Sequence, residues 1–350
     1  MTNREKHKQQ LIETLTHAQR IAFAPLMFQA VNSIIEFGIL KSVDPKPHSK
    51  TELMQELNLN EYTVTTLLEA AEVIGIIEKN EKKEYSSTQL GQAFLYDEMT
   101  KVNFEYVRDV CYSGAESLTE SFQKSSCEGF KKLFPKADTI YPYLTKLPAK
   151  MQRSWYGFDH YYSDCCFDIV YKIISDSKKI FDIGANTGKF ERLCLKKNPN
   201  IDITMVDLPD NIEYVRNDKE LEGCKFFSTN VLDEKSDFPQ ISGAVLMSQF
   251  LDCFSKEQII FILKRIALNS SADTKVYILE PFIDRQRFEG AKFSLIHTSL
   301  YFTCMANGKS KMYSYSDMEE MINQSGWKIS SVYDEIGAHD YTFLECVKNV

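Results

Sequence analysis

The 350-residue sequence predicts an α/β fold that follows a mainly helical N-terminal region. After about residue 177, short apolar runs alternate with amphipathic helical segments, which is typical of a parallel sheet with helices on both faces. Before that point, helical periodicity prevails. A glycine-containing turn joins the first predicted strand of the α/β part to its helix, at residues 181–190. We therefore expect an N-terminal domain at 1–100, a helical linker at 101–176 and the α/β domain at 177–350.

The overall composition narrows the class of protein. Hydrophobic residues make up 43% of the chain, charged residues 26%, and the net charge is −8, which is the balance of a globular protein. A negative chain is a poor match for nucleic acid or an anionic membrane. The N-terminus is charged and lacks the apolar core of a signal peptide, and no apolar run reaches the ~18 residues of a membrane span. We expect a cytoplasmic protein that binds neither nucleic acid nor membrane.

The nine cysteines are scattered and form no C-x-x-C pair. Such spacing favours buried free thiols over a disulfide framework or a zinc site. We therefore expect no bound metal.

The N-terminal region resembles a winged helix in its order of elements. A helical stripe is followed by Pro45 and Pro47, which interrupt the chain. Residues 50–80 then read as a helix, a turn near residues 58–60 and a second helix that Gly75 ends. Residues 76–86 read as a small hairpin, so the order is helix, turn, helix, hairpin.

A winged helix can read DNA, and a transcription regulator is therefore one hypothesis. The predicted recognition helix, residues 61–72, carries three glutamates and no Lys or Arg. A DNA-reading helix needs cations for phosphates and base edges. We therefore disfavour this hypothesis.

Residues 101–176 are rich in aromatic side chains. They are consistent with ordinary core packing and also with helices that roof a pocket, and the sequence leaves both readings open.

The α/β part shows its elements clearly. Strands are expected at 178–184, 203–209, 224–231, 244–251 and 275–282, and helices at 188–199, 211–220 and 255–268. The tail adds a helix at 316–326 and strands at 328–336 and 341–348. A terminal antiparallel pair on a parallel sheet is common in large mixed sheets.

The turn at residues 181–190, FDIGANTGKF, is the most informative segment. Gly184 and Gly188 allow a tight turn and close approach to a ligand. Asn186 and Lys189 occupy positions where the dinucleotide pattern G-x-G-x-x-G needs glycine, and the Walker spacing is also absent. The pattern that remains, D-x-G-x-x-x-G, favours a nucleoside ligand without phosphates. Asp182, or the carbonyls beside it, can accept a hydrogen bond from an ammonium group.

The ends of the next strands supply further polar groups. Asp207 lies about 20 residues past the glycine turn, where a carboxylate binds ribose hydroxyls in such folds; its alternative role is a helix N-cap. Asn230 ends the third strand, where it can meet an adenine amine, and Val231 can cover the ring. With the glycine turn, including Asn186, and with Leu208 and Ser248, these residues predict a site for S-adenosylmethionine.

Several segments together resemble a known family, the S-adenosylmethionine-dependent O-methyltransferases of the plant caffeic-acid and bacterial polyketide-tailoring type. The similar segments are residues 32–95, ending in YSSTQLGQAFL, then FDIGANTGKF, MVDLP, AVLMSQFLDCFSKEQ and VYILEPF. The resemblance implies a Rossmann-like class I methyltransferase domain and an N-terminal winged-helix dimerisation domain. It also implies a homodimer, and methyl transfer to a hydroxyl of a small aromatic or polyketide-like acceptor.

The chain departs from the family at the catalytic position. The family's general-base His falls on Asp252, the Asp and Trp after it fall on Cys253 and Phe254, and a later Glu falls on Ser310. Glu280 is the member of the usual set that remains.

Asp252 is the first candidate base, because apolar neighbours would raise its pKa toward that of a phenol. A helix cap is its alternative role. Glu280 is the second candidate, and it would orient the acceptor. His160 and His297 are further candidates, although a lone histidine is more often packed or exposed. A set of aromatic and methionine residues lines either the acceptor pocket or the core: Met247, Phe250, Tyr301, Phe302 and Met305.

Two further functions remain open. An aspartate in the position of the base also fits carbon methylation of a phenolic ring, and the missing His is consistent with a cofactor-binding protein without turnover.

Overall fold

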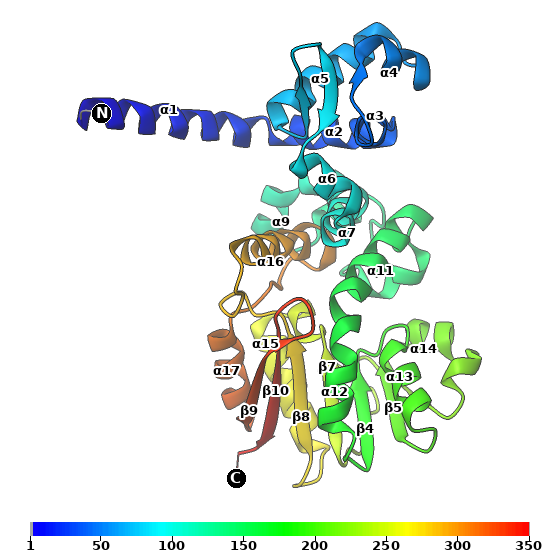
Figure 1. Cartoon of the computed structure of the whole chain (residues 1–350). Helices are drawn as coiled ribbons and strands as arrows, with labels where there is room; N and C mark the ends of the chain where they lie inside the picture. The colour runs from blue at the N-terminus through cyan, green and yellow to red at the C-terminus, as the bar shows by residue number, and fades with distance from the viewer. Residues whose placement is uncertain (1–2, 350) are drawn as a thin grey trace. The chain divides into compact units, whose positions relative to one another are not determined.

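The computed structural model describes residues 3–349, which divide between Phe104 and Glu105 into two compact units (Figure 1). The division falls four residues after the boundary expected at residue 100, and residues 105–176 belong to the unit that contains the α/β sheet. Each unit has its own buried apolar clusters.

The first unit has the predicted order of helix, turn, helix and hairpin. Its elements are α1(Asn3–Ala22), α2(Ala24–Glu36), α3(Ile39–Val43), β1(His48–Ser49), α4(Lys50–Glu56), α5(Glu61–Ile74), β2(Ile77–Lys79), β3(Glu84–Ser87), α6(Gln89–Tyr96) and the start of α7(Glu98–Tyr106). The Ser49 side chain caps α4, the Asn60 side chain caps α5, and Gly75 ends α5 with a φ of 91°. The strands form an antiparallel sheet of order β1-β3-β2. The winged-helix prediction is confirmed.

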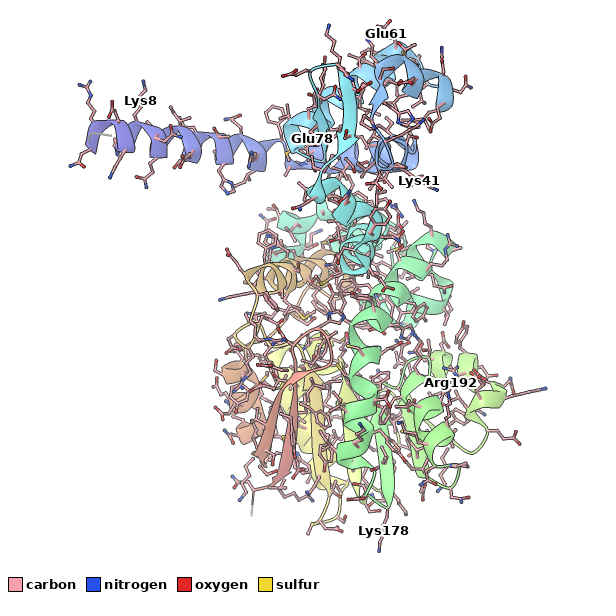
Figure 2. All side chains as sticks on the ribbon, viewed as in Figure 1. Lys8, Lys41, Glu61, Glu78, Lys178 and Arg192 are labelled. Atoms are coloured by element: carbon pink, nitrogen blue, oxygen red, sulfur yellow. The ribbon has the colours of Figure 1, made fainter. Side chains whose placement is uncertain are left out.

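Helix α1 is unusual because none of its 20 residues is buried. Figure 2 shows Lys8 among the side chains that project from it. Its exposed side chains include Leu11, Ile12 and Leu15, which water solvates poorly. An isolated helix of this length is marginally stable in water, so α1 needs a packing partner.

The second unit begins with helices that lead into the sheet. They are η1(Val107–Cys111), α8(Tyr112–Ala115), α9(Leu118–Lys124), α10(Glu128–Lys131), η2(Tyr141–Lys146), α11(Ala149–Ser163), η3(Asp164–Cys166) and α12(Phe167–Ile174). Many of their aromatic residues pack with α16(Glu289–Tyr301) and η6(Phe302–Ala306) in one buried cluster.

The sheet has seven strands in the order β6-β5-β4-β7-β8-β10-β9. Their bounds are β4(Lys179–Ile183), β5(Asp202–Asp207), β6(Lys225–Ser228), β7(Ala244–Ser248), β8(Lys275–Glu280), β9(Trp327–Ile336) and β10(Tyr341–Lys348). The first five are parallel, β10 is antiparallel to β8, and β9 is antiparallel to β10. Each strand begins and ends close to its predicted bounds, and the α/β prediction is confirmed.

The strand order creates a crevice at one edge of the sheet. From β4 the chain proceeds outward through β5 and β6, and then returns to β7 on the other side of β4. Such a reversal of direction is where open α/β sheets bind ligands, at the carboxyl ends of the strands. The ends of β4 and β7 therefore mark the expected site.

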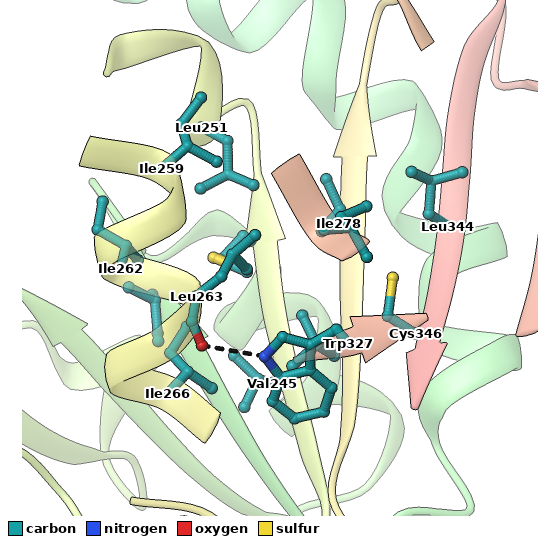
Figure 3. Packing of buried hydrophobic residues seen from close by; sticks show 14 of the residues in the cluster. Val245, Leu251, Ile259, Ile262, Leu263, Ile266, Ile278, Trp327, Leu344 and Cys346 are labelled. Atoms are coloured by element: carbon teal, nitrogen blue, oxygen red, sulfur yellow. Dashed lines mark hydrogen bonds between the residues drawn. The ribbon is translucent and has the colours of Figure 1, made fainter. Parts of the chain in front are cut away.

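Helices cover both faces of this sheet (Figure 1). Besides α12, α16 and η6, the helical elements of this part are α13(Lys189–Lys197), α14(Pro209–Val215), η4(Lys219–Leu221), η5(Leu251–Cys253), α15(Lys256–Leu268) and α17(Tyr315–Gln324). The Trp327 indole N–H donates to the Leu263 carbonyl at 3.0 Å, and the ring packs beside α15 (Figure 3). Because this ring is fully buried, it fixes β9 against a helix that begins just after the candidate catalytic turn.

Candidate active site

A cavity of about 250 Å³ opens at the carboxyl ends of β4, β5 and β7. The sheet contributes its polar strand ends, and the helical segment before it contributes aromatic walls that include Tyr106, Trp155 and Phe158. Tyr106 and Phe158 stack with ring centroids 3.9 Å apart, and the Trp155 indole N–H donates to the Tyr301 hydroxyl at 2.8 Å. The aromatic segment therefore contributes both to the core and to the pocket wall, two readings that the sequence left open.

The glycine turn follows β4 as predicted. Gly184 has a φ of 84°, and a Cβ there would lie 2.2 Å from the Phe250 ring. Gly188 has a φ of 78° and begins α13. Asn186 also has a positive φ, 51°, a conformation that Asn tolerates better than most residues. Asn186 can therefore occupy the position at which the dinucleotide pattern has glycine.

Asp207 accepts hydrogen bonds from the glycine turn and from the segment that follows β5. One carboxylate oxygen accepts from the Asn186 backbone N–H at 2.8 Å, and the other accepts from the Leu208 N–H at 2.6 Å and from the Asn211 side chain at 2.8 Å. Leu208, not Asp207, is the N-cap of α14. Burial raises the pKa of Asp207. The alternative helix-cap role is therefore wrong, and the carboxylate lines the cavity.

Asp182, near the end of β4, lies close to a second buried carboxyl group that sequence reasoning missed. Glu191, in the first turn of α13, is fully buried, and its carboxyl oxygens have no partner among the described donors. Burial raises the pKa of both groups, and their mutual repulsion raises that of Glu191 further. A protonated Glu191 beside Asp182 avoids two buried negative charges.

Three more predicted cofactor residues line the cavity at the ends of β6 and β7: Asn230, Val231 and Ser248. The Asn230 Oδ1 accepts from the Leu232 N–H at 3.0 Å, so a local turn uses part of its capacity. The Ser248 hydroxyl is buried and has no partner among the described residues. An unsatisfied buried hydroxyl is unfavourable, which makes Ser248 a donor or acceptor that a ligand can satisfy.

The C-terminal end of α11 and the adjoining η3 contact the glycine turn. The Asn186 side-chain amide donates to Asp159 at 2.9 Å, the Thr187 hydroxyl lies 3.2 Å from His160 Nε2, and Lys189 pairs with Asp164. His160 therefore lies where the cavity meets the glycine turn. Its contacts are those of a residue that holds this turn, rather than those of a free acceptor-side base.

Asp252 lies in η5, just past the end of β7, and lines the cavity. It is 6% exposed. Burial, reinforced by the charge of Asp159, raises the pKa of Asp252 to about 7, although the Cys253 thiol donates to it at 3.4 Å and opposes the shift. Ser255 caps the helix that follows, through a capping box with Gln258, so the alternative helix-cap role of Asp252 is wrong.

Glu280 lies at the end of β8 and accepts backbone hydrogen bonds from the η5 turn that contains Asp252. Its Oε1 accepts from the backbone N–H groups of Phe250, Leu251 and Asp252 at 3.1, 2.9 and 3.4 Å. Glu280 is buried and is not among the residues that line the cavity. The expectation that Glu280 touches the acceptor is therefore corrected: it positions Asp252 by holding the backbone of η5.

His297 is not brought to the site. It lies on the exposed face of α16, where its Nδ1 is 2.8 Å from the Phe293 carbonyl and its ring packs on Phe293. Met247 and Met305 are completely buried core residues, whereas Phe250, Tyr301 and Phe302 line the cavity. Helical periodicity marks a face, and it does not tell which face meets a ligand.

Sequence reasoning assigned no individual role to several polar residues of the cavity, among them Thr139, Tyr141 and Asp159. The hydroxyls of Thr139 and Tyr141 are buried without a partner among the described residues. Burial raises the pKa of Tyr141, and the nearby Cys253 thiol reinforces this. These residues lie in helices and turns without a motif, so only the folded arrangement shows that they line the same cavity as Asp252.

Comparison with known proteins places this geometry in a family. Residues 16–84 match the Dimerisation2-like domain, and residues 163–328 match the O-methyltransferase domain. With both domains in this order, the chain belongs to the S-adenosylmethionine-dependent O-methyltransferases, and its cofactor is S-adenosylmethionine. No curated protein sequence matches the chain.

Solved structures show the same fold at low sequence identity. Mitomycin 7-O-methyltransferase MmcR is 15% identical with a TM-score of 0.72, over 99% of this chain and all of its own. Human N-acetylserotonin methyltransferase, in complex with S-adenosylmethionine, is 12% identical with a TM-score of 0.64, over 96% of this chain and 98% of its own. A protein described as a pericyclic reaction enzyme is 15% identical with a TM-score of 0.64, over 99% of this chain and 94% of its own.

Within residues 3–349, no helix combines the length and apolar character that crossing a bilayer requires. The same residues contain no group of three His, Cys, Asp or Glu side chains arranged to hold a metal ion.

Proposed function

We propose that the chain transfers a methyl group from S-adenosylmethionine to a hydroxyl of a small aromatic or polyketide-like acceptor, with Asp252 as the general base. The observation that carries the proposal is the position of Asp252, a buried carboxyl with a raised pKa on the wall of an aromatic-lined cavity. The substrate class rests on the aromatic wall and on the resemblance of the fold to the mitomycin and N-acetylserotonin enzymes.

The residues present fit the cofactor. The Ser248 hydroxyl is buried without a protein partner among the described residues, so a bound ligand can satisfy it. Asp207 would hold the ribose hydroxyls, Val231 would cover the adenine, and Asn230 would meet its amine. Asp182 and the carbonyls of the turn would receive the ammonium group.

The charge of the cavity wall supports the same ligand. Four carboxyl groups line it, those of Asp159, Asp182, Asp207 and Asp252. Lys189, a cation of the wall, is already paired with Asp164. A sulfonium cation is therefore favoured over its neutral demethylated product.

The chemistry needs a deprotonated nucleophile held in line with the methyl donor. When bound, the cofactor supplies an electrophilic methyl group on a sulfonium. Asp252 accepts the proton of the acceptor hydroxyl, and Glu280 holds the turn that aims Asp252. The Tyr141 and Thr139 hydroxyls orient the acceptor, while the aromatic wall excludes water and fixes the ring. Such alignment supplies much of the rate of a displacement.

Product analysis tests this proposal. Purified protein is incubated with cofactor labelled in its methyl group and a panel of phenols, and the products are identified by mass spectrometry and nuclear magnetic resonance. We expect a labelled methyl ether. A product with the label on ring carbon and a free phenol would replace the proposal with carbon methylation.

A second candidate is catalysis that uses the bound cofactor without methyl transfer. The missing family histidine favours it, as does the fold of the neighbour described as a pericyclic reaction enzyme. Release of demethylated cofactor separates the two functions, because only methyl transfer produces it in proportion to product.

We also propose that the chain forms a homodimer through its first unit. The support is the Dimerisation2-like match over residues 16–84 and the exposed apolar side chains of α1.

A further inference from the structure

Two adjacent cysteines outside the cavity, Cys165 and Cys166, form an unusual pair. Their sulfur atoms lie 3.9 Å apart in η3, with Cys165 exposed and Cys166 buried. The turn between β9 and β10 packs directly on them. The Ala338 backbone N–H donates to Cys165 Sγ at 3.4 Å, and the Cys166 thiol donates to the Ile336 carbonyl at 3.5 Å.

Gly337 makes this packing possible. A Cβ at Gly337 would lie 2.7 Å from the Cys165 sulfur and 2.8 Å from the Cys166 sulfur. The two sulfurs therefore meet backbone at this turn. One backbone N–H, that of Ala338, points at Cys165 and stabilises a thiolate there, whereas the carbonyls of Tyr162 and Ile336 accept from the two thiols. Any other residue at this position would displace the turn from the sulfur pair.

The surroundings of Cys165 also favour its thiolate. The neighbouring Cys166 thiol, the Ala338 N–H and the charge of His339 lower the pKa of Cys165 to about 6, against the effect of burial. His339 packs on the rings of Tyr161 and Tyr162 at the end of α11. The nearest acidic group along η3, Asp164, is paired with Lys189 and His160. The pKa of Cys166, by contrast, is raised, first by its hydrogen bond with Cys165 and then by burial.

The pair also lies next to the cavity wall. Ser163 and Phe167, on either side of η3, line the cavity. Asp164, within η3, holds Lys189 of the glycine turn. A group attached to Cys165 would displace the Ala338 contact and move η3, and this movement would reach the cofactor site.

We propose that Cys165 is a modification site, a reactive thiol that exchanges with low-molecular-weight disulfides and, once modified, weakens cofactor binding. The Cys165 thiolate attacks one sulfur of the disulfide R–S–S–R, and a bond forms between Cys165 and that sulfur. The S–S bond of the reagent breaks, and R–S⁻ leaves and takes a proton from water. Cys165 is oxidised to a mixed disulfide, and the other half of the reagent is reduced to a thiol.

Geometry makes the mixed disulfide the end state. Consecutive Cα atoms are about 3.8 Å apart across a trans peptide, whereas disulfides usually join Cα atoms about 4.4–6.8 Å apart. A bond between Cys165 and Cys166 is therefore strained, and Cys166 does not displace the added group efficiently. An external thiol reverses the modification.

The first test measures modification with oxidised glutathione. Wild-type protein, Cys165→Ser, Cys166→Ala and the matched control Cys224→Ser are followed by intact mass, and adducts are mapped by peptide mass spectrometry. From its thiolate fraction and reduced nucleophilicity, Cys165 should react at about pH 6 roughly tenfold faster than the thiol of a reference peptide. Cys165→Ser should lose this phase and Cys224→Ser should keep it. Cys166→Ala removes a donor to the thiolate, so the pH at which the rate is half maximal should rise.

The second test measures binding of S-adenosylhomocysteine by calorimetry before and after modification. Affinity should fall several-fold with the adduct and return after reduction with dithiothreitol, while treated Cys165→Ser should bind as before treatment. An adduct on other cysteines, or a rate that becomes half maximal above about pH 8 as for an ordinary thiol, would overturn the reactive site. Unchanged affinity with Cys165 fully modified would overturn the coupling. Untreated protein that binds no cofactor would instead contradict the cofactor site.

Discussion

Asp252 differs in charge and basicity from the histidine that its family usually has at this position. An ordinary aspartate, with a pKa of about 3.9, is a weak base toward a phenol with a pKa of about 10. Burial and the charge of Asp159 raise the pKa of Asp252 to about 7. About half of the pKa mismatch is thereby removed, and a buried carboxylate becomes comparable to an imidazole as a base.

Replacement of Asp252 by asparagine should abolish the base while keeping the shape of the side chain. We expect kcat to fall by about 10²–10⁴-fold, the usual contribution of a general base, with cofactor affinity nearly unchanged. Steady-state kinetics and calorimetry measure the two effects. In wild type, kcat/KM should rise with pH and level off above about 7, because only ionised Asp252 accepts a proton. Asp273→Asn, an exposed change, is the control. A wild-type rate for Asp252→Asn would exclude Asp252 as the base.

Ionisation of Asp252, which activity requires, should lower the stability of the folded protein. Because the folded pKa of Asp252 is raised, its contribution to stability is greatest below the unfolded pKa and is lost as pH rises through about 7. Asp252→Asn does not ionise and escapes this loss. Denaturant unfolding from pH 4 to pH 8 should therefore show the free energy of unfolding of the variant rising relative to that of wild type, by about 4 kcal/mol at the upper end. Parallel curves would show that burial does not disfavour the charged form.

At the scale of elements, the site depends on two turns that follow strands of the sheet. The glycine turn after β4 donates hydrogen bonds to Asp159 of α11 and to Asp207. The η5 turn after β7 donates backbone hydrogen bonds to Glu280. Phe250 connects the two, because its ring occupies the space beside Gly184. A change in the structure of one turn should therefore shift the other.

Gly184→Ala tests this connection. The added Cβ would lie 2.2 Å from the Phe250 ring, and alanine would have to adopt the positive φ of this position. That conformation costs alanine about 1 kcal/mol or more relative to glycine. We expect cofactor affinity and kcat to fall together, by at least tenfold. Gly290→Ala on α16, where a Cβ meets open space, should leave both unchanged. If Gly184→Ala bound cofactor as tightly as wild type, the turn would not approach the ligand as described.

The sequence predicts the elements of the sheet better than those of the cavity wall. Strands buried on both faces are nearly continuous apolar runs, such as residues 244–248, and their ends carry the polar groups of the site. The sequence does not reveal the role of Glu280, because the partners of its carboxyl group are backbone N–H groups of a distant turn. His297 and Tyr141 show the same limit, since helical spacing does not reveal that one is exposed and the other faces the cavity.

At the scale of the whole molecule, the first unit carries an apolar surface that a single copy leaves exposed. Leu15 of α1 is 56% exposed and Leu26 of α2 is 67% exposed. A helix with no buried residue gains little from folding alone, whereas pairing with a second copy removes its apolar side from water. The homodimer would thus stabilise α1.

Charge placed on this surface should separate the copies. We expect wild type to sediment as a dimer, and Leu15→Glu combined with Leu26→Glu to sediment as a monomer at micromolar concentration, because two buried charges would face their symmetry mates. Lys8→Glu, a change at a polar position of α1, should remain dimeric. A monomeric wild type would contradict the proposal.

Calorimetric titration of purified protein with S-adenosylmethionine tests the central claim, that the cavity between the glycine turn and Asp207 is shaped for an adenosine with a sulfonium. We expect one site per chain, and about a hundredfold weaker binding in Asp207→Ala, which loses two hydrogen bonds to a carboxylate. Failure of wild type to bind this ligand or its demethylated product, together with binding of a nicotinamide dinucleotide, would contradict it.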